Sequence, residues 1–331
     1  MNCLICKVRE ADFKGSHIIP HFIIAPGISD GSTTRDIEQS FRIDGTGSDF
    51  SFGRSVLPEA LEDTLGRPVT DEEIENNEHH YVRDDIYCTQ TEVQLSKFES
   101  LYNNQVSPPL LNAVTLSDDL KRVAHFFWLS IILRCSVVEF NGFKLAPDLE
   151  QEVSDEVNAV LAESESEIRQ KCLAQPLTRN IFIGYTGEPE DFTRNFTLLH
   201  PNKKSPYLLI INNYVIIYDY SNNNQLTDIL NEMGATTPVA YVTGTIIHHF
   251  SESDRNSIIR YCAAIGADQF IVTTKASFEE AFFHNRQSMP TPQQISDFFT
   301  ELLHHDDSLL PTVRYDASRV KELIQKHSQP A

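Results

Sequence analysis

The sequence of 331 residues predicts an α+β protein in three segments. We expect a zinc-bound N-terminal module at residues 1–112, a helical connector at 113–176 and a C-terminal α+β domain with a mixed sheet at 177–331. Three observations predict this organisation. A C-x-x-C pair near the N-terminus is followed far downstream by a lone cysteine, which is how a chain closes a loop around zinc. Apolar residues keep helical spacing through the middle of the chain, and short apolar runs separated by turn residues follow.

Composition narrows the classes of protein. The formal net charge is −20 at pH 7, which counts against a protein that clamps long stretches of duplex, because nucleic-acid affinity comes largely from Lys and Arg. An enzyme with a local basic patch and a metal ion is still compatible with this charge. Cys135, Cys172 and Cys262 lie in apolar segments and are expected to be buried thiols rather than a disulfide framework. We see no signal peptide and no membrane span, so a cytoplasmic location is expected.

The cysteine pattern predicts a metal centre. Cys3 and Cys6 are separated by two residues, which lets both sulfurs reach one ion, and Cys88 supplies a third thiolate. Loss of such a zinc would cost the N-terminal loop much of its folding free energy. His17 follows the C-x-x-C pair on a segment where Pro20 prevents a helix from starting, so its ring is a candidate for chemistry as well as for ordinary half-burial.

These residues resemble the zinc-containing branch of the HNH endonucleases, which have the ββα-metal fold. The resemblance covers residues 1–140 and rests on Cys3-x-x-Cys6, on Ser16-His17-Ile18-Ile19-Pro20 and on Cys88-x-x-Thr91-Glu92, with a further similar segment at Leu129–Arg134. It implies that His17 is the general base that activates water and that Cys3, Cys6 and Cys88 hold a structural zinc. It also implies that Asp85 or Glu92 holds a catalytic Mg²⁺ or Mn²⁺.

The function implied by the resemblance is hydrolysis of phosphodiester bonds in nucleic acid, in a setting of bacterial defence, with the C-terminal domain controlling cleavage. Thr91 stands where the family has a fourth zinc cysteine, and threonine is not a zinc ligand. His79 and His80 precede Cys88, and we assign His80 as the fourth ligand, with a solvent-exposed pair as the alternative. The second hypothesis for the whole chain is a catalytically degenerate zinc scaffold that binds a protein partner or a small ligand.

The N-terminal elements follow from local patterns. A strand-like apolar piece is expected before Pro26, and a loop with a short strand pair around residues 40–43. An acidic, partly helical stretch at 56–77 contains a helix start with Thr70 as N-cap and Glu73 three residues later. A helix over 92–102 has its apolar face at Val93, Leu95, Phe98 and Leu101.

The apolar spacing in the middle of the chain predicts a buried helix. Ser117 is its expected N-cap, and apolar residues keep helical spacing from Leu120 to Cys135. Arg134 lies inside this apolar stretch and needs a carboxylate partner, so it either braces the core or reaches the active site to hold phosphate. A polar helix is expected over 147–175.

The C-terminal domain predicts a mixed, mainly antiparallel sheet. The expected strands are 180–185, 207–211, 215–218, 240–247 and 269–273, with Asn212-Asn213 as the hairpin turn. The expected helices are 225–233, 252–265 (ended by Gly266), 278–284, 292–304 and 317–326. We find no catalytic constellation there, because the histidine pairs at 248–249 and 304–305 are adjacent and diverge. A role in sensing a small-molecule trigger, in protein-partner binding or in homo-oligomerisation is expected.

Overall fold

The computed structural model describes residues 1–28, 38–44, 47–53, 55–65, 67–75, 77, 79–187, 197–199, 204–235, 244–304 and 317–329. The fold is α+β, as predicted. The chain divides into two compact units: Met1–Gly27 with Tyr81–Tyr261, and Ile28–His80 with Cys262–Ala331. The boundaries predicted near residues 112 and 176 stay predictions. Residues 113–176 all belong to the first unit, whereas 28–80 belong to the second.

The first unit opens with a split hairpin. Strand β1 (Ser16–His17) pairs antiparallel with β4 (Val82–Arg83), with His17 opposite Val82, and helix α4 (Thr89–Gln105) follows β4. The strand-like piece expected before Pro26 is wrong, because residues His21–Ile28 form helix α1. Ile23 N and Ile24 N both donate to Pro20 O, at 2.9 and 3.4 Å, so the turn after Pro20 is already helical.

Helix α6 (Asp118–Val137) is the centre of the first unit, and it is buried as predicted. Ser117 accepts a hydrogen bond from Leu120 N as its N-cap, and every residue from Val123 to Ser136 is buried. It packs against α4, α7 (Pro147–Val160) and α8 (Glu165–Ala174). The polar helix predicted over 147–175 is therefore two helices, because Ser164 caps a new one. Short helices α5 (Ser107–Leu111) and η1 (Phe140–Gly142) flank α6 in sequence.

Aromatic side chains bind α4 to α6. The Tyr102 and Phe127 rings stack with centroids 3.8 Å apart, and Trp128 Nε1 donates to Tyr102 Oη at 3.1 Å. Leu95, Phe98 and Leu101 are buried on the same helix, as predicted, whereas Val93 is 45% exposed and is not part of the apolar face. The helix that carries Glu92 is thus held rigidly on the core.

A five-stranded sheet completes the first unit. Its order is β6 (Thr197–Leu199), β7 (Tyr207–Ile211), β8 (Tyr214–Tyr218), β5 (Ile181–Tyr185), β9 (Thr245–His249), and only β5–β9 is parallel. The predicted β7–β8 hairpin is confirmed, with Asn212 at φ 50° in its turn. Gly184 has no room for a side chain, because an added Cβ would lie 2.3 Å from Phe250 Cε2. Residues 240–243 of the strand predicted at 240–247 lie outside the described residues, and its end falls in β9.

Helix α9 (Asn223–Glu232) confirms the prediction for 225–233. The strand predicted at 269–273 and the helix end predicted at Gly266 are both wrong, because Glu252–Arg286 forms one helix, α10. Its buried residues recur at helical spacing, and an added Cβ at Gly266 would meet nothing within 4 Å. The buried stripe consists of Ile258, Cys262, Phe270, Thr274, Phe278 and Phe282. The period of this stripe, four residues, overrides the β-branched run at 271–273.

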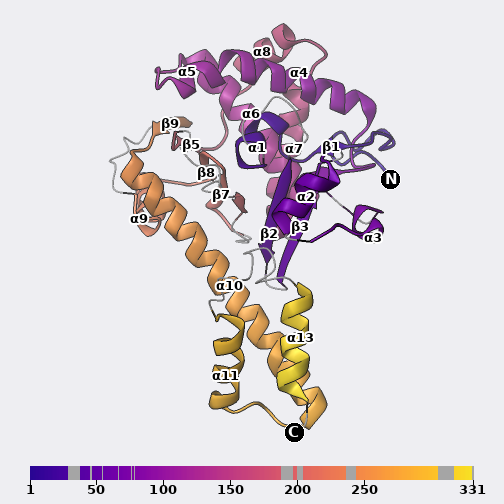
Figure 1. The fold of residues 1–331 in the computed structure, drawn as a ribbon. Helices are drawn as coiled ribbons and strands as arrows, with labels where there is room; N and C mark the ends of the chain where they lie inside the picture. Colours follow the sequence, from indigo (N-terminus) through magenta and orange to yellow (C-terminus); the bar gives the residue numbers. More distant parts are fainter. Residues whose placement is uncertain are drawn as a thin grey trace. The chain divides into compact units, whose positions relative to one another are not determined.

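The second unit contains two further modules. Strands β2 (Gln39–Asp44) and β3 (Gly47–Phe52) confirm the predicted strand pair, and helices α2 (Pro58–Leu65) and α3 (Asp71–Glu75) follow. Thr70 Oγ1 accepts from Glu73 N at 3.2 Å, as predicted. Helices α11 (Pro292–Leu302) and α13 (Ala317–Ser328) lie beside the C-terminal half of α10 (Figure 1). The ring of Phe278 on α10 stacks on the ring of Phe298 on α11, with centroids 4.4 Å apart.

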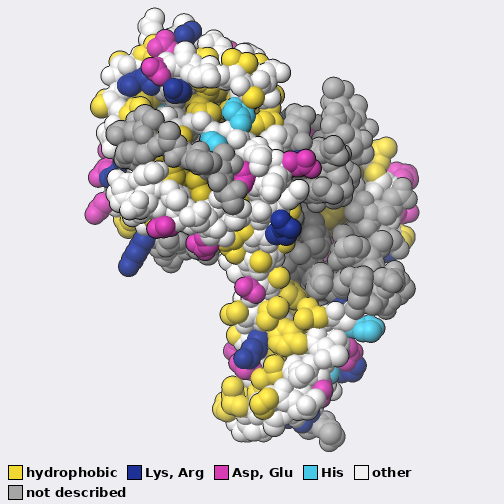
Figure 2. Space-filling view, turned by 90° about the vertical axis from the view of Figure 1, so that its left-hand side faces the viewer, with side chains coloured by type: hydrophobic (Ala, Val, Ile, Leu, Met, Phe, Trp, Pro, Cys, Tyr) yellow, Lys and Arg dark blue, Asp and Glu magenta, His cyan; other side chains and the backbone are white. Residues whose placement is uncertain are grey.

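Hydrophobic side chains are also exposed on these helices, as Figure 2 shows. Val272, Phe283 and Met289 are 67%, 50% and 61% exposed. Among the described residues, no helix is both long enough and apolar enough to cross a membrane.

The contact between α6 and β9 predicts a pH dependence. His125 Nδ1 lies 3.0 Å from Thr245 Oγ1, and burial, with a smaller contribution from Arg122, lowers the pKa of His125 to about 3. The neutral ring is favoured by the fold, so its contribution to stability is complete above the unfolded pKa near 6.5 and is lost as the pH falls toward 3.

Between pH 6.5 and pH 4, the free energy of unfolding of the wild type should fall by about 3 kcal/mol more than that of His125→Gln. The reason is that glutamine keeps a hydrogen-bonding group but does not titrate. Urea denaturation at a series of pH values measures this. Equal pH slopes for the two proteins would contradict the assignment.

Candidate functional site

The N-terminal loop folds back on itself around Cys3 and Cys6. Cys3 N donates to Arg9 O at 2.7 Å, and Lys7 N donates to Cys3 O at 2.9 Å. Lys7, directly after Cys6, has φ 58°, and the chain reverses its direction there. An antiparallel bridge between Asn2 and Glu10 closes the loop. Both thiols are therefore directed by backbone hydrogen bonds rather than by packing alone.

The loop is joined by its backbone to the segment that carries Cys88. Leu4 N donates to Ile86 O at 2.9 Å, and Asp12 N and Phe13 N donate to Tyr87 O at 3.2 and 3.1 Å. Asp12 Oδ1 accepts from Thr89 N at 2.7 Å, in the first turn of α4. A carboxylate at a helix N-terminus is stabilising. Segments far apart in sequence are thereby fixed within reach of one metal ion.

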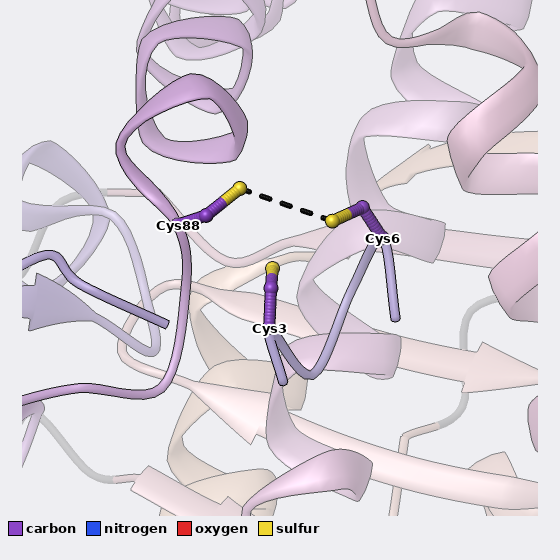
Figure 3. A group of neighbouring side chains, drawn as sticks. All are labelled: Cys3, Cys6 and Cys88. Atoms are coloured by element: carbon purple, nitrogen blue, oxygen red, sulfur yellow. Dashed lines mark hydrogen bonds between the residues drawn. The ribbon is translucent and has the colours of Figure 1, made fainter. Parts of the chain in front are cut away.

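The three thiols form a cluster, which Figure 3 shows with its sulfurs converging from the loop and from the start of α4. Cys3, Cys6 and Cys88 Sγ atoms all lie within 4.8 Å of one another, and Cys6 Sγ is 3.8 Å from Cys88 Sγ. A tetrahedral zinc with bonds of about 2.3 Å separates its sulfurs by about 3.8 Å. The thiol cluster therefore fits zinc, and the predicted cysteine ligands are brought together.

The acidity of the thiols also suits a metal. Burial raises the pKa of Cys6, but hydrogen bonds from the backbone of Arg9 and Val8 and from the side chains of Cys3 and Thr91 outweigh it and lower the pKa to about 6. Burial raises the pKa of Cys3 in the absence of an ion. Zinc is bound by thiolates, so the lowered pKa of Cys6 favours metal binding at neutral pH.

The fourth position of the thiol cluster is next to Thr91. Thr91 Oγ1 lies 3.4 Å from Cys3 Sγ and 3.2 Å from Cys88 Sγ. Within the described part of the chain, the group of close ligand atoms consists of the three thiols and does not include His80, which the sequence assigned as the fourth ligand. His80 belongs to the second unit, where its backbone N donates to Ser51 Oγ at 3.3 Å.

His17 lies on the split hairpin, half-buried on β1. The next residue, Ile18, donates its N–H to Tyr81 O at 2.9 Å. The His17 ring is 6.0 Å from the His21 ring, centroid to centroid. Arg134 Nη1 donates to His17 O at 3.4 Å, which joins the predicted catalytic strand to α6.

Arg134 has the carboxylate partner that its burial requires. Its side chain is 1% exposed, and Nη1 bonds Glu99 Oε1 at 2.8 Å. The sequence did not identify Glu99 as the partner of Arg134, although Glu99 stands two helical turns after Glu92 on α4 and so shares a face with it. Arg134 Nε and Nη2 are buried and have no hydrogen-bond partner among the described residues. The guanidinium thus links β1 to α4, and two of its nitrogens make no hydrogen bond to the described residues.

Glu92 faces the same guanidinium. Burial raises the pKa of its carboxyl, while the Ser16 hydroxyl and the charge of Arg134 act in the opposite direction. Glu92 Oε1 and Tyr87 Oη are both buried, and neither has a hydrogen-bond partner in the described part of the chain. The charges of Arg134 and Glu92 both act on Tyr87. We call Ser16, Tyr87, Glu92, Glu99 and Arg134 the buried polar cluster. It lies directly beside the strand of His17.

Asp85, the other predicted ligand of a catalytic ion, is engaged elsewhere. Its carboxylate pairs with Lys14, and its backbone N donates to Phe13 O at 2.9 Å. Asp84 Oδ1 accepts from Gly15 N at 2.7 Å in the same turn. Among the described residues, no group of three or more close metal-ligating side chains includes Asp85, Glu92 or His17.

In comparisons with known proteins, no protein-family model, no curated protein and no solved structure matches the chain.

The thiol cluster predicts that zinc stabilises the first unit. Cys88→Ser should lose the zinc that the wild type carries, and a chelator should lower the Tm of the wild type but not that of the variant. Elemental analysis and thermal unfolding measure both effects. Cys172→Ser, which removes a buried thiol outside the cluster, is the control and should keep its zinc. Full zinc content in Cys88→Ser would count against the site.

The ion pair of Arg134 predicts a strongly non-additive pair of mutations. Arg134→Met should cost about 3–5 kcal/mol, because it leaves the Glu99 carboxylate without its partner. Replacing both residues, as Arg134→Met with Glu99→Leu, should cost less than Arg134→Met alone. Urea denaturation of the two single variants and the double variant measures the coupling. Additive costs would mean that the pair contributes nothing specific.

Proposed function

We propose that the chain is a metal-dependent endonuclease of the HNH-like type, which hydrolyses phosphodiester bonds of nucleic acid on a zinc-stabilised N-terminal module. One observation carries the proposal. The hairpin strand with His17 and the helix with Glu92 meet at one buried guanidinium, that of Arg134, which bonds His17 O and acts on the Glu92 carboxyl. The order strand, strand, helix is that of a ββα unit, with residues 18–81 inserted between its strands.

Each residue has a distinct role in this proposal. His17 takes the proton of the attacking water as general base. Glu92 would hold Mg²⁺ or Mn²⁺, which supplies Lewis-acid stabilisation of the leaving oxygen when it is bound. Asp85 would have to leave its ion pair with Lys14 to contribute a second carboxylate. Arg134, through His17 O, fixes the strand on which the base stands.

Control of cleavage is assigned to the C-terminal part of the chain. Residues 177–331 would bind a small-molecule trigger or a protein partner, or would mediate homo-oligomerisation, in a role in bacterial defence. The support is the apolar surface of α10, where Val272 and Phe283 are exposed, and of the segment between α10 and α11, where Met289 is exposed. Exposed apolar patches mark interaction sites when they are contiguous.

A second function is favoured by a specific observation. Thr91, which is not a zinc ligand, lies beside Cys3 and Cys88, and Arg134 is already paired with Glu99. A catalytically degenerate zinc scaffold that binds a protein partner or a small ligand would look the same. The two functions differ in whether the His17 ring is needed for any reaction.

The test is cleavage of supercoiled plasmid and of single-stranded RNA with Mg²⁺ or Mn²⁺. His17→Ala should reduce the rate by about 10²–10⁴-fold, which is the usual contribution of a general base. His21→Ala is the matched control, because this second imidazole lies 6.0 Å away, and it should cleave at close to the wild-type rate. All proteins should carry equal zinc.

The outcomes separate the two functions. Cleavage that persists in His17→Ala would sink the assignment of the base. No cleavage by zinc-loaded wild type, on either substrate, would favour the scaffold.

A further inference from the structure

The thiol cluster offers three ligands where a structural zinc has four. Closed structural sites hold zinc with four protein ligands, whereas sites with three protein ligands keep a position for water or another molecule. In the described residues the cluster contains Cys3, Cys6 and Cys88 and no histidine or carboxylate. Cys135, Cys172 and Cys262, the remaining cysteines, are buried outside it.

Thr91 lies beside the thiol cluster but is not a zinc ligand. Its hydroxyl is 3.2 Å from Cys88 Sγ and 3.4 Å from Cys3 Sγ, so it is a hydrogen-bond partner of the sulfurs. A neutral hydroxyl can donate one hydrogen bond to a zinc-bound thiolate. Thr91 thus supports the thiolates from outside the coordination shell, as residues around a metal commonly do.

The cluster is least buried on the side of Cys6. Cys3 and Cys88 are 1% and 2% exposed, whereas Cys6 is only half-buried. The residues that follow Cys6 are exposed, among them Val8 at 82%. A small molecule would therefore reach an ion held by the three thiols from the side of Cys6.

We propose that zinc bound here has three protein ligands and an exchangeable fourth position that takes a low-molecular-weight thiol, with water as the ligand otherwise. On binding, the thiol loses its proton to solvent, its sulfur bonds the ion, and the water leaves. A soft thiolate suits an ion that already has sulfur ligands. This site is independent of the proposed nuclease activity.

The test uses the full chain with Co²⁺ in place of zinc and 2-mercaptoethanol as the probe. In the wild type, the thiol should shift the visible d–d bands and strengthen the thiolate-to-cobalt charge-transfer band with saturation. Thr91→Cys should show the strengthened band before any thiol is added and should not respond to it. It should also bind zinc about tenfold more tightly or better, because it supplies a fourth thiolate.

Thr91→Ser is the matched control, because it keeps the hydroxyl, and it should respond like the wild type. This variant keeps the test decisive if Thr91→Cys folds poorly. A wild-type spectrum that ignores the thiol would overturn the proposal and would mean that a fourth ligand from the protein occupies the position. A four-thiolate spectrum in the wild type without added thiol would overturn it as well.

Discussion

The first unit depends on joining its first residues to the segment before α4. The backbone bonds from Leu4 to Ile86 and from Phe13 to Tyr87 bring the two together, and the thiol cluster stands at the junction. The residues between these two segments, 28–80, belong to the second unit. Closing so long a loop costs conformational entropy, and a metal ion is an effective way to offset that cost.

Arg134 makes a second connection of the same kind from inside the core. Its guanidinium bonds Glu99 on α4 and the backbone of His17 on β1, so α6 fixes the distance between the candidate base and the helix of Glu92. Its unused donors, with Glu92 Oε1 and Tyr87 Oη, leave the buried polar cluster incompletely satisfied. Buried polar atoms without partners are uncommon, and a catalytic role is one of the explanations for them. The same residues that brace the fold therefore stand where the chemistry is proposed.

The predictions that the structure confirms rest on patterns among residues close in sequence. The C-x-x-C spacing predicted that two thiols lie together because it is a property of one turn, and the N-caps at Ser117 and Thr70 depend only on neighbouring residues. The strand predicted at 269–273 failed because a β-branched run was judged alone, although Phe270 continues the buried stripe of α10. Glu99 as the partner of Arg134, and the exclusion of His80 from the thiol cluster, depend on tertiary contacts that no local pattern contains.

X-ray absorption at the zinc edge of the full chain tests the central claim, that three thiolates from two distant segments hold one ion. The account predicts three sulfur neighbours at about 2.3 Å and one oxygen at about 2.0–2.2 Å. Protein prepared with a thiol should show four sulfurs. A nitrogen neighbour in place of the oxygen would assign the fourth corner to a histidine, and a spectrum without sulfur neighbours would contradict the thiol cluster itself.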